Sequence, residues 1–180
     1  MKKKQMTANI FIFAAQNYVS RYFASTHMLR KALERRAYRF IREHGGDMET
    51  AKPLIENAIQ FCIHEHAIND IHFAKTMVAE LQKNGVSRIK IKQKLFQKGI
   101  SVSVIHDALL EHHDQHHPQR EAILYAKKRG FGPYRAQHIQ EERLQKELAS
   151  MVRAGHSYAI SKEVLRLSQT EAQSILAKEE

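Results

Sequence analysis

The side chains best suited to chemistry in this chain are cations, and they gather in one stretch. Residues 81–106 contain six lysines and arginines and no acid, namely Lys83, Arg88, Lys90, Lys92, Lys94 and Lys98. On a helix over residues 87–98, Lys90, Lys94 and Lys98 lie on the arc opposite the apolar edge of Ile91 and Leu95. Such a face can neutralise the phosphates of a nucleic acid or meet an acidic protein surface. The alternative is an ordinary solvated helix face, and the pattern leaves both open.

A second group of cations surrounds a predicted break in the chain at residues 130–133. Its members are Lys127, Lys128, Arg129 and Arg135, with the aromatic residues Phe131 and Tyr134 between them. Cations interleaved with aromatic rings are typical of surfaces that follow a nucleic-acid backbone and stack on a base. The competing interpretation is that a helix dipole attracts the cations to its C-terminus while both rings lie in the core.

Catalytic chemistry has little support in this sequence. Two histidine pairs at helical i,i+4 spacing could ligate zinc, and they are formed by His112, His113, His116 and His117. No cysteine joins them and Pro118 follows directly, so a polar linker explains the run better than a metal-dependent hydrolase does. Asp70 stands at a predicted helix start, where a carboxylate acts as a cap rather than as an acid or base. The sequence predicts a protein that is not an enzyme and has no cofactor or metal.

The composition indicates a helical protein with an anionic partner. The 180 residues carry 29 Lys and Arg against 19 Asp and Glu, a net charge of +10 that favours nucleic acid first, although it also serves solubility alone. Only seven glycines and three prolines interrupt good helix formers, so we expect an all-α fold. The single cysteine, Cys62, indicates a buried thiol in a reducing compartment, with the cytoplasm as the expected location. No stretch is long enough to span a bilayer.

Two recurrences indicate the elements that must position the cations. The pattern of Ser25, Leu29 and Leu33 returns as Ser87, Ile91 and Leu95, and a second pattern starting at Leu95, with Gly99 and Ser101, returns at Met151, with Gly155 and Ser157. They predict an array of helical units over residues 1–68, 69–115 and 116–180, the last including a C-terminal helix. Stacked units leave an extended outer surface, which suits a long partner such as a filament or nucleic acid.

Capping residues and apolar spacing predict the individual helices. The expected spans are about 8–23, 25–43, 50–65, 69–83, 87–98, a helix starting at Ser101, 118–129, 136–153, a short helix starting at Ser157, and 168–176. Pro53 is expected in the first turn of its helix, and Asn69 or Asp70 is expected to cap the helix that follows it.

Five stretches in this order and spacing resemble the RecX family, regulators of the RecA recombinase. They are Tyr18-x2-Arg21-Tyr22-x2-Ser25-x3-Leu29-Arg30-x2-Leu33, Asp70-x2-Phe73-Ala74, Ser87-x3-Ile91-x3-Leu95-x2-Lys98-Gly99-Ile100, Gly132-Pro133-Tyr134-Arg135, and Gly155-x-Ser157-Tyr158 leading into Val164-Leu165. Two features depart from the family pattern: the joint over residues 37–50 is long, and His156 stands where many relatives carry an aromatic residue.

The resemblance implies three tandem three-helix repeats in an elongated, curved monomer that lies in the groove of a RecA filament on DNA. It also implies a regulator without catalytic activity that inhibits recombinase and coprotease functions, and so acts in DNA repair and the SOS response. DNA would be reached through or alongside RecA. The expected contact residues are Arg88, Lys90, Lys94, Lys98, Lys127, Lys128, Arg129 and Arg135.

The alternative is a nucleic-acid-binding helical module that acts without RecA. Its turn would be Gly99-Ile100-Ser101, joining two helices in helix-turn-helix fashion. The exposed side of the second helix offers Ser103, His106 and Asp107 but no Arg or Asn placed to read bases, so sequence-specific recognition is not expected.

Overall fold

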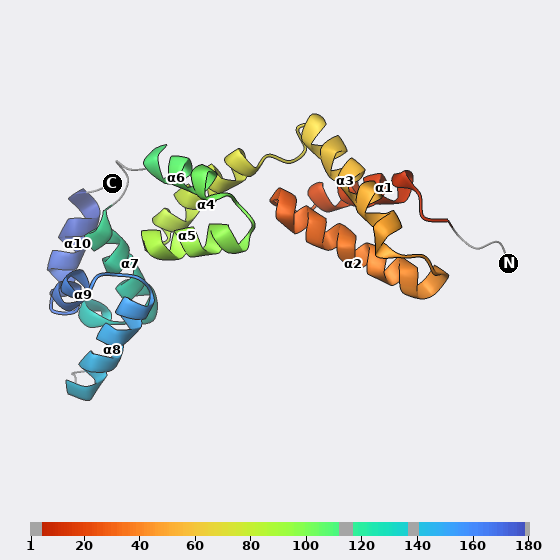
Figure 1. The fold of residues 1–180 in the computed structure, drawn as a ribbon. Coiled ribbons are helices and arrows are strands. Elements are labelled where there is room, and N and C mark those ends of the chain that lie inside the picture. Colours follow the sequence, from red (N-terminus) through yellow and green to blue (C-terminus); the bar gives the residue numbers. More distant parts are fainter. Residues whose placement is uncertain (1–4, 112–116, 137–140, 179–180) are drawn as a thin grey trace. The chain divides into compact units, whose positions relative to one another are not determined.

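The computed structural model describes residues 5–111, 117–136 and 141–178, and within these ranges it contains helices and no strand (Figure 1). The predicted all-α fold is therefore confirmed. The elements are α1 (Ala8–Val19), α2 (Thr26–His44), α3 (Met48–His64), α4 (Asp70–Lys83), α5 (Arg88–Gln97), α6 (Val102–Glu111), α7 (Pro118–Arg129), the short 3₁₀ helix η2 (Gly132–Tyr134), α8 (Glu141–Arg153), α9 (Tyr158–Val164) and α10 (Gln169–Lys178).

The chain forms two compact units. The first contains the residues up to Ala74 together with Phe96–Val104, and the second contains Lys75–Leu95 together with the residues from Ile105 onward. The boundary between the units thus runs through α4, α5 and α6. The division into three repeats over 1–68, 69–115 and 116–180 stays a prediction.

The core of the first unit lies among α1, α2 and α3, and α1 packs against both of the others. Phe11 of α1, Leu29 and Leu33 of α2, and Ile55 and Ile59 of α3 are almost completely buried. These residues recur three to four positions apart because that spacing places them on one side of a helix. Burial also raises the pKa of the thiol of Cys62, which packs in the same core as predicted.

One core of the second unit is built by α7, α8, α9 and α10. Ile123, Met151, Val164, Leu165 and Ala172 are buried in it, and α7 packs against α9 and η2. This core holds the C-terminal ends of α7 and α8 in place. The last turn of α7 carries Lys127, Lys128 and Arg129, and the last turn of α8 carries Arg153.

Each unit contains the same joint, built on a serine. In the first unit, Ser25 Oγ accepts a hydrogen bond from Met28 N at 3.2 Å and donates one to the carbonyl of Lys98 at 2.5 Å. In the second unit, Ser87 Oγ accepts from Lys90 N at 3.4 Å and donates to the carbonyl of Ala154 at 2.6 Å. Each serine therefore caps one helix and closes the end of another.

Both joints also require a glycine directly after the accepting carbonyl. Gly99 and Gly155 have φ of +76° and +89°, values that residues other than glycine rarely adopt. A Cβ on Gly99 would overlap His27, and a Cβ on Gly155 would lie 2.5 Å from Ser87 Oγ. The two recurrences found in the sequence, one based on serine and one on glycine, are thus the two halves of one joint.

Several predicted helix ends were wrong. Helix α1 ends at Val19 rather than near residue 23, because Phe23 leaves the helix to stack on Phe73 with ring centroids 4.9 Å apart. Helix α3 begins at Met48, where Asp47 caps it by accepting from Thr50 N at 2.7 Å, so Pro53 lies beyond the first turn.

The predicted cap of α4 is confirmed at Asn69, one of its two candidates, while Asp70 has a different role. Asn69 caps α4 by accepting from His72 N at 3.0 Å, whereas Asp70 accepts from Thr26 N at 2.7 Å and so caps the start of α2. Arg135 has an extended backbone conformation (φ −70°, ψ 143°) after η2. The described part of α8 begins at Glu141, and residues 137–140, next to the start predicted at about residue 136, lie outside the described residues.

Candidate functional site

Three members of the two predicted groups of cations line one cleft in the second unit. Lys90 and Lys94 of α5, Arg129 at the end of α7, and Arg153 at the end of α8 all line it, and it encloses 390 Å³. We call it the basic cleft. Its full lining is Gly85, Val86, Ser87, Lys90, Lys94, Tyr125, Arg129, Ser150, Arg153, Ala154 and His156.

Local sequence rules explain why these cations line the cleft. Ile91 and Leu95 are buried, which turns Lys90 and Lys94, one helical turn apart, to one side of α5. Arg129 and Arg153 are the last residues of their helices, where the negative end of the helix dipole favours a cation. The guanidinium of Arg129 also lies 5.7 Å from the ring centroid of Tyr125.

Among the described residues, no acidic side chain balances the charges of the basic cleft. No Asp or Glu lines it, and within the described part of the chain none of its four cations forms an ion pair. Lys90 Nζ instead donates to the neutral Oε1 of Gln93 at 3.0 Å. Like charges around one cleft repel one another, so this arrangement favours an anion from outside.

Arg88, the first residue of α5, lines a different pocket. Together with Lys92 it lines a pocket of 610 Å³ whose other lining residues include the exposed apolar side chains Ile89, Val152 and Tyr158. The structure therefore does not bring Arg88 together with Lys90 and Lys94, although all three lie within two helical turns.

Lys98 belongs to the first unit and is partly buried. Its backbone carbonyl accepts the hydrogen bond from Ser25, so the residue already takes part in a joint. Lys127 and Lys128 are exposed near the end of α7, and Lys127 Nζ lies 6.0 Å from the ring centroid of Tyr134. Tyr134 and Phe131 pack against the core of the second unit, as the structural interpretation of these rings predicted.

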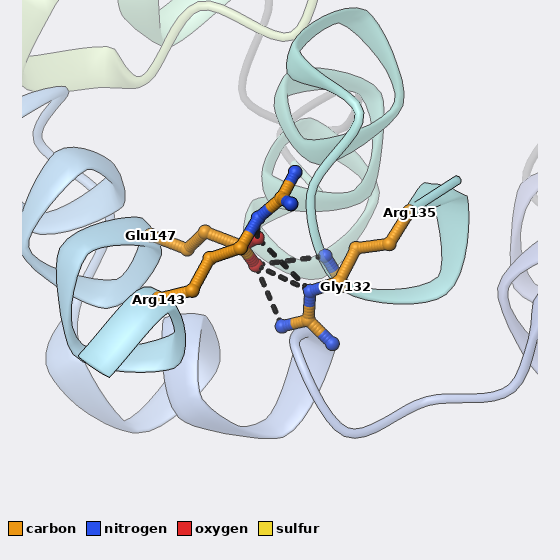
Figure 2. Close-up of polar contacts among 4 residues, drawn as sticks. All are labelled: Gly132, Arg135, Arg143 and Glu147. Carbon is orange, nitrogen blue, oxygen red and sulfur yellow. Dashed lines mark hydrogen bonds and ion pairs between the residues drawn. The ribbon is translucent and has the colours of Figure 1, made fainter. Parts of the chain in front are cut away.

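Arg135 forms a buried ion pair within the fold. Figure 2 shows its guanidinium against the carboxylate of Glu147, with Nε–oxygen distances of 2.7 and 3.0 Å. Gly132 N donates to the same carboxylate at 3.1 Å, and Arg143 approaches it at 3.5 Å. The side chains of Arg135 and Glu147 are only 9% and 3% exposed. This buried ion pair ties η2 and the residue after it to α8, and we leave Arg135 out of the contact surface proposed below.

Sequence reasoning missed several residues of the basic cleft. Arg153 carries the same signal as Lys127, Lys128 and Arg129, namely a cation at a predicted helix end. Ser150 and Tyr125 offered no signal, and His156 stood out only as a departure from the family pattern, because only the packing of α8 on α7 brings these residues to one place.

The described residues contain no group of three or more His, Cys, Asp or Glu side chains that could hold a metal ion. Of the histidine run, His112, His113 and His116 lie outside the described residues, and His117 directly precedes α7. Among the helices that the structure describes, none combines the length and apolar character needed to cross a bilayer.

Comparison with known proteins gives related sequences. A family model described as "RecX, second three-helix domain" matches residues 69–109. The regulatory protein RecX of Myxococcus xanthus (strain DK1622) is 31% identical over 153 residues, which cover 84% of this chain and 82% of that protein. The protein of the same name from Agrobacterium fabrum (strain C58 / ATCC 33970) is 34% identical over 151 residues, covering 83% and 78%. No solved structure matches.

Proposed function

The chain belongs to the RecX family of regulatory proteins, and from this premise we propose that it binds the RecA filament on DNA and restrains its activity. The observation that supports this proposal most directly is the basic cleft, where four cations from three helices lack an acidic partner among the described residues. A filament of protein on DNA offers the matching negative charge. The restrained activities would be strand exchange and RecA-stimulated proteolysis, and through them DNA repair and the SOS response.

Regulation in this proposal works by occupancy. A protein bound along the filament changes how the filament grows or dissociates without making or breaking a covalent bond. Its affinity is electrostatic in large part, so it falls as salt rises. We further propose that the protein acts in the cytoplasm and binds the filament as a monomer.

The proposed contact surface has the basic cleft at its centre. Lys90, Lys94 and Arg129 line the cleft, while Lys127 and Lys128 are exposed on the same turn of α7 as Arg129. Arg88, at its own pocket, is an outer candidate. Lys98 belongs to the first unit and is proposed as a separate contact.

A double charge reversal tests the proposal. We expect Lys90→Glu with Lys94→Glu to weaken inhibition of RecA ATP hydrolysis by roughly tenfold or more in the concentration required, because two attractive contacts become repulsive. The matched control is Lys146→Glu with Lys162→Glu, which makes the same charge change at exposed residues of the second unit outside the cleft. Inhibition unchanged by the first pair, or equally weakened by both pairs, would overturn the proposed contact.

The alternative, a nucleic-acid-binding module that acts without RecA, is separated by two measurements. A pull-down of RecA with and without single-stranded DNA, across a salt series, shows whether the filament is the partner. Tight and sequence-selective gel shifts without RecA would favour the alternative instead.

A further inference from the structure

One side chain at the basic cleft lacks a hydrogen-bond partner. His156 is only 7% exposed, and its Nε2 has no partner among the described residues. Burial lowers the pKa of His156 to about 4, so the ring is neutral near pH 7. A buried polar group without a partner costs stability. His156 lines both the basic cleft and the pocket of Arg88 and Lys92, and its Nε2 is enclosed by protein atoms, so the ring reports on a molecule in the cleft without being placed to bond it.

Two hydroxyl groups line the same cleft. Tyr125 Oη and Ser150 Oγ lie 3.3 Å apart, and either can donate to the other. The pair carries two hydroxyl hydrogens, and its mutual hydrogen bond uses one of them. The second remains available to an acceptor in the cleft.

The lining favours a backbone contact over base recognition. Bases are read in a groove by Asn, Gln, Asp or Glu side chains, by Arg or Lys paired with guanine, and by Ser or Thr. The basic cleft has no side-chain amide or carboxylate, and its cations surround a concave space rather than projecting from a ridge. These groups suit a compact anion with several acceptor oxygens.

We infer that the basic cleft is a binding site for a phosphate group of a DNA backbone. Lys90, Lys94, Arg129 and Arg153 neutralise the charge, while the hydroxyl pair of Tyr125 and Ser150 supplies a hydrogen bond. Phosphate suits this site better than a carboxylate, because donors from α5, α7 and α8 approach from several sides and a tetrahedral group presents oxygens to several sides. The contact positions the backbone and carries no base information.

This inference rests on the proposed function for the source of the phosphate, which would be the DNA of the RecA filament. It deepens that function by assigning the cleft to DNA rather than to acidic groups of RecA subunits.

The test measures binding of the full chain to a fluorescent thymidine oligonucleotide without RecA. We expect Arg129→Gln with Arg153→Gln to weaken binding by roughly tenfold and to lower the slope of log affinity against log salt by about 1 to 2, because up to two phosphate contacts are lost. Arg→Lys at both positions should restore most of the binding, and Lys146→Gln with Lys162→Gln serves as the control. Circular dichroism checks that each variant is folded.

A second measurement reports on the site itself. In histidine-selective ¹⁵N NMR, the ring nitrogen of His156 should shift when the oligonucleotide is added, and inorganic phosphate at millimolar concentration should shift it in the same direction. An oligonucleotide with an uncharged methylphosphonate backbone should leave it unchanged. A shift caused equally by the uncharged backbone would overturn the inference.

The outcomes separate this inference from the proposed function. If the Arg129 and Arg153 variant binds DNA normally but no longer binds the RecA filament, acidic groups of RecA occupy the cleft and the phosphate site is refuted. If it loses DNA binding yet inhibits RecA normally, the phosphate site is supported and the proposed role of the cleft in regulation fails. Equal loss in the control variant would mean that general charge, not the cleft, attracts DNA.

Discussion

The two serine joints share one design but differ in what surrounds it. Two positions before the serine, the first unit has Phe23 and the second has Gly85. Phe23 stacks on Phe73, whereas Gly85 lines the basic cleft and lets the chain approach α7 so closely that a Cβ would lie 2.6 Å from Leu124. A repeated scaffold thus has an aromatic ring before the serine in one copy and a close approach to α7 in the other.

The residue after the joint glycine differs as well. Ile100 follows Gly99 and is buried and apolar, while His156 follows Gly155 and is buried with an unpartnered Nε2. At this position the second joint therefore carries a buried polar ring, whereas the first carries an apolar side chain. The following predictions test this difference, beginning with the largest effect.

Removing the joint glycine in the second unit should have the largest effect. We expect Gly155→Ala to lower the free energy of unfolding by about 2–4 kcal/mol, because the left-handed backbone is strained with a side chain and the Cβ crowds Ser87 Oγ. Urea unfolding measures this change. Gly130→Ala is the control, since its φ of +65° is also positive but its Cβ has only an ordinary contact at 3.7 Å. A Gly155→Ala cost no greater than the control's would contradict the crowded joint.

Removing the joint serines tests whether the two copies are energetically equivalent. Ser25→Ala and Ser87→Ala should each cost about 2–3 kcal/mol, because each loses a helix cap and leaves a carbonyl without its donor. Ser157→Ala removes a cap alone and should cost about 1 kcal/mol in the same urea experiment. Joint serines that cost no more than Ser157 would show that the donated bond contributes nothing.

Acid should loosen the second joint and not the first. Burial places the pKa of His156 at about 4 in the folded state, below its ordinary value of 6.5, so the unfolded state binds more protons between these values. This contribution to stability is retained above pH 6.5 and is lost as the pH falls toward 4, by on the order of 2 kcal/mol.

Hydrogen exchange followed from pH 7 to pH 4.5 checks this expectation. Amides near Gly155 should lose protection relative to those near Gly99, and His156→Phe should abolish the difference. Equal loss of protection at both joints would remove His156 as the cause.

The smallest effect should come from removing Asp70, a second cap of α2 that has been found only at the first joint. Asp70→Ala removes the acceptor for Thr26 N and should cost about 1 kcal/mol, since the serine cap of α2 remains. Asp70→Asn keeps an acceptor oxygen and should cost less. Protection of the first turn of α2 in hydrogen exchange is the local measurement, and a loss confined to the start of α4 would contradict this pairing.

Local patterns were sufficient to predict the elements of the fold. The all-α class follows from the helix formers and the few breakers, and Ser25 and Ser157 were predicted as caps because a capping hydroxyl acts within its own helix turn. The ends that were wrong involve long-range contacts, such as the stacking of Phe23 on Phe73.

The candidate site was only half predictable for the same reason. Lys90, Lys94 and Arg129 stand out in the sequence as charges, but their convergence with Arg153 depends on how α5, α7 and α8 pack. Arg135 looked like its neighbours and was expected at the surface with them. The distant Glu147 determines its burial, and no local pattern pairs the two.

The serine joints link residues that are far apart in the order of synthesis. Ser25 bonds to a carbonyl 73 positions later, and Ser87 to one 67 positions later. On a ribosome the first joint can close once Lys98 has emerged, but the second must wait for Ala154. The wall that Arg153 and Ala154 contribute to the basic cleft is therefore absent until the last part of the chain is translated.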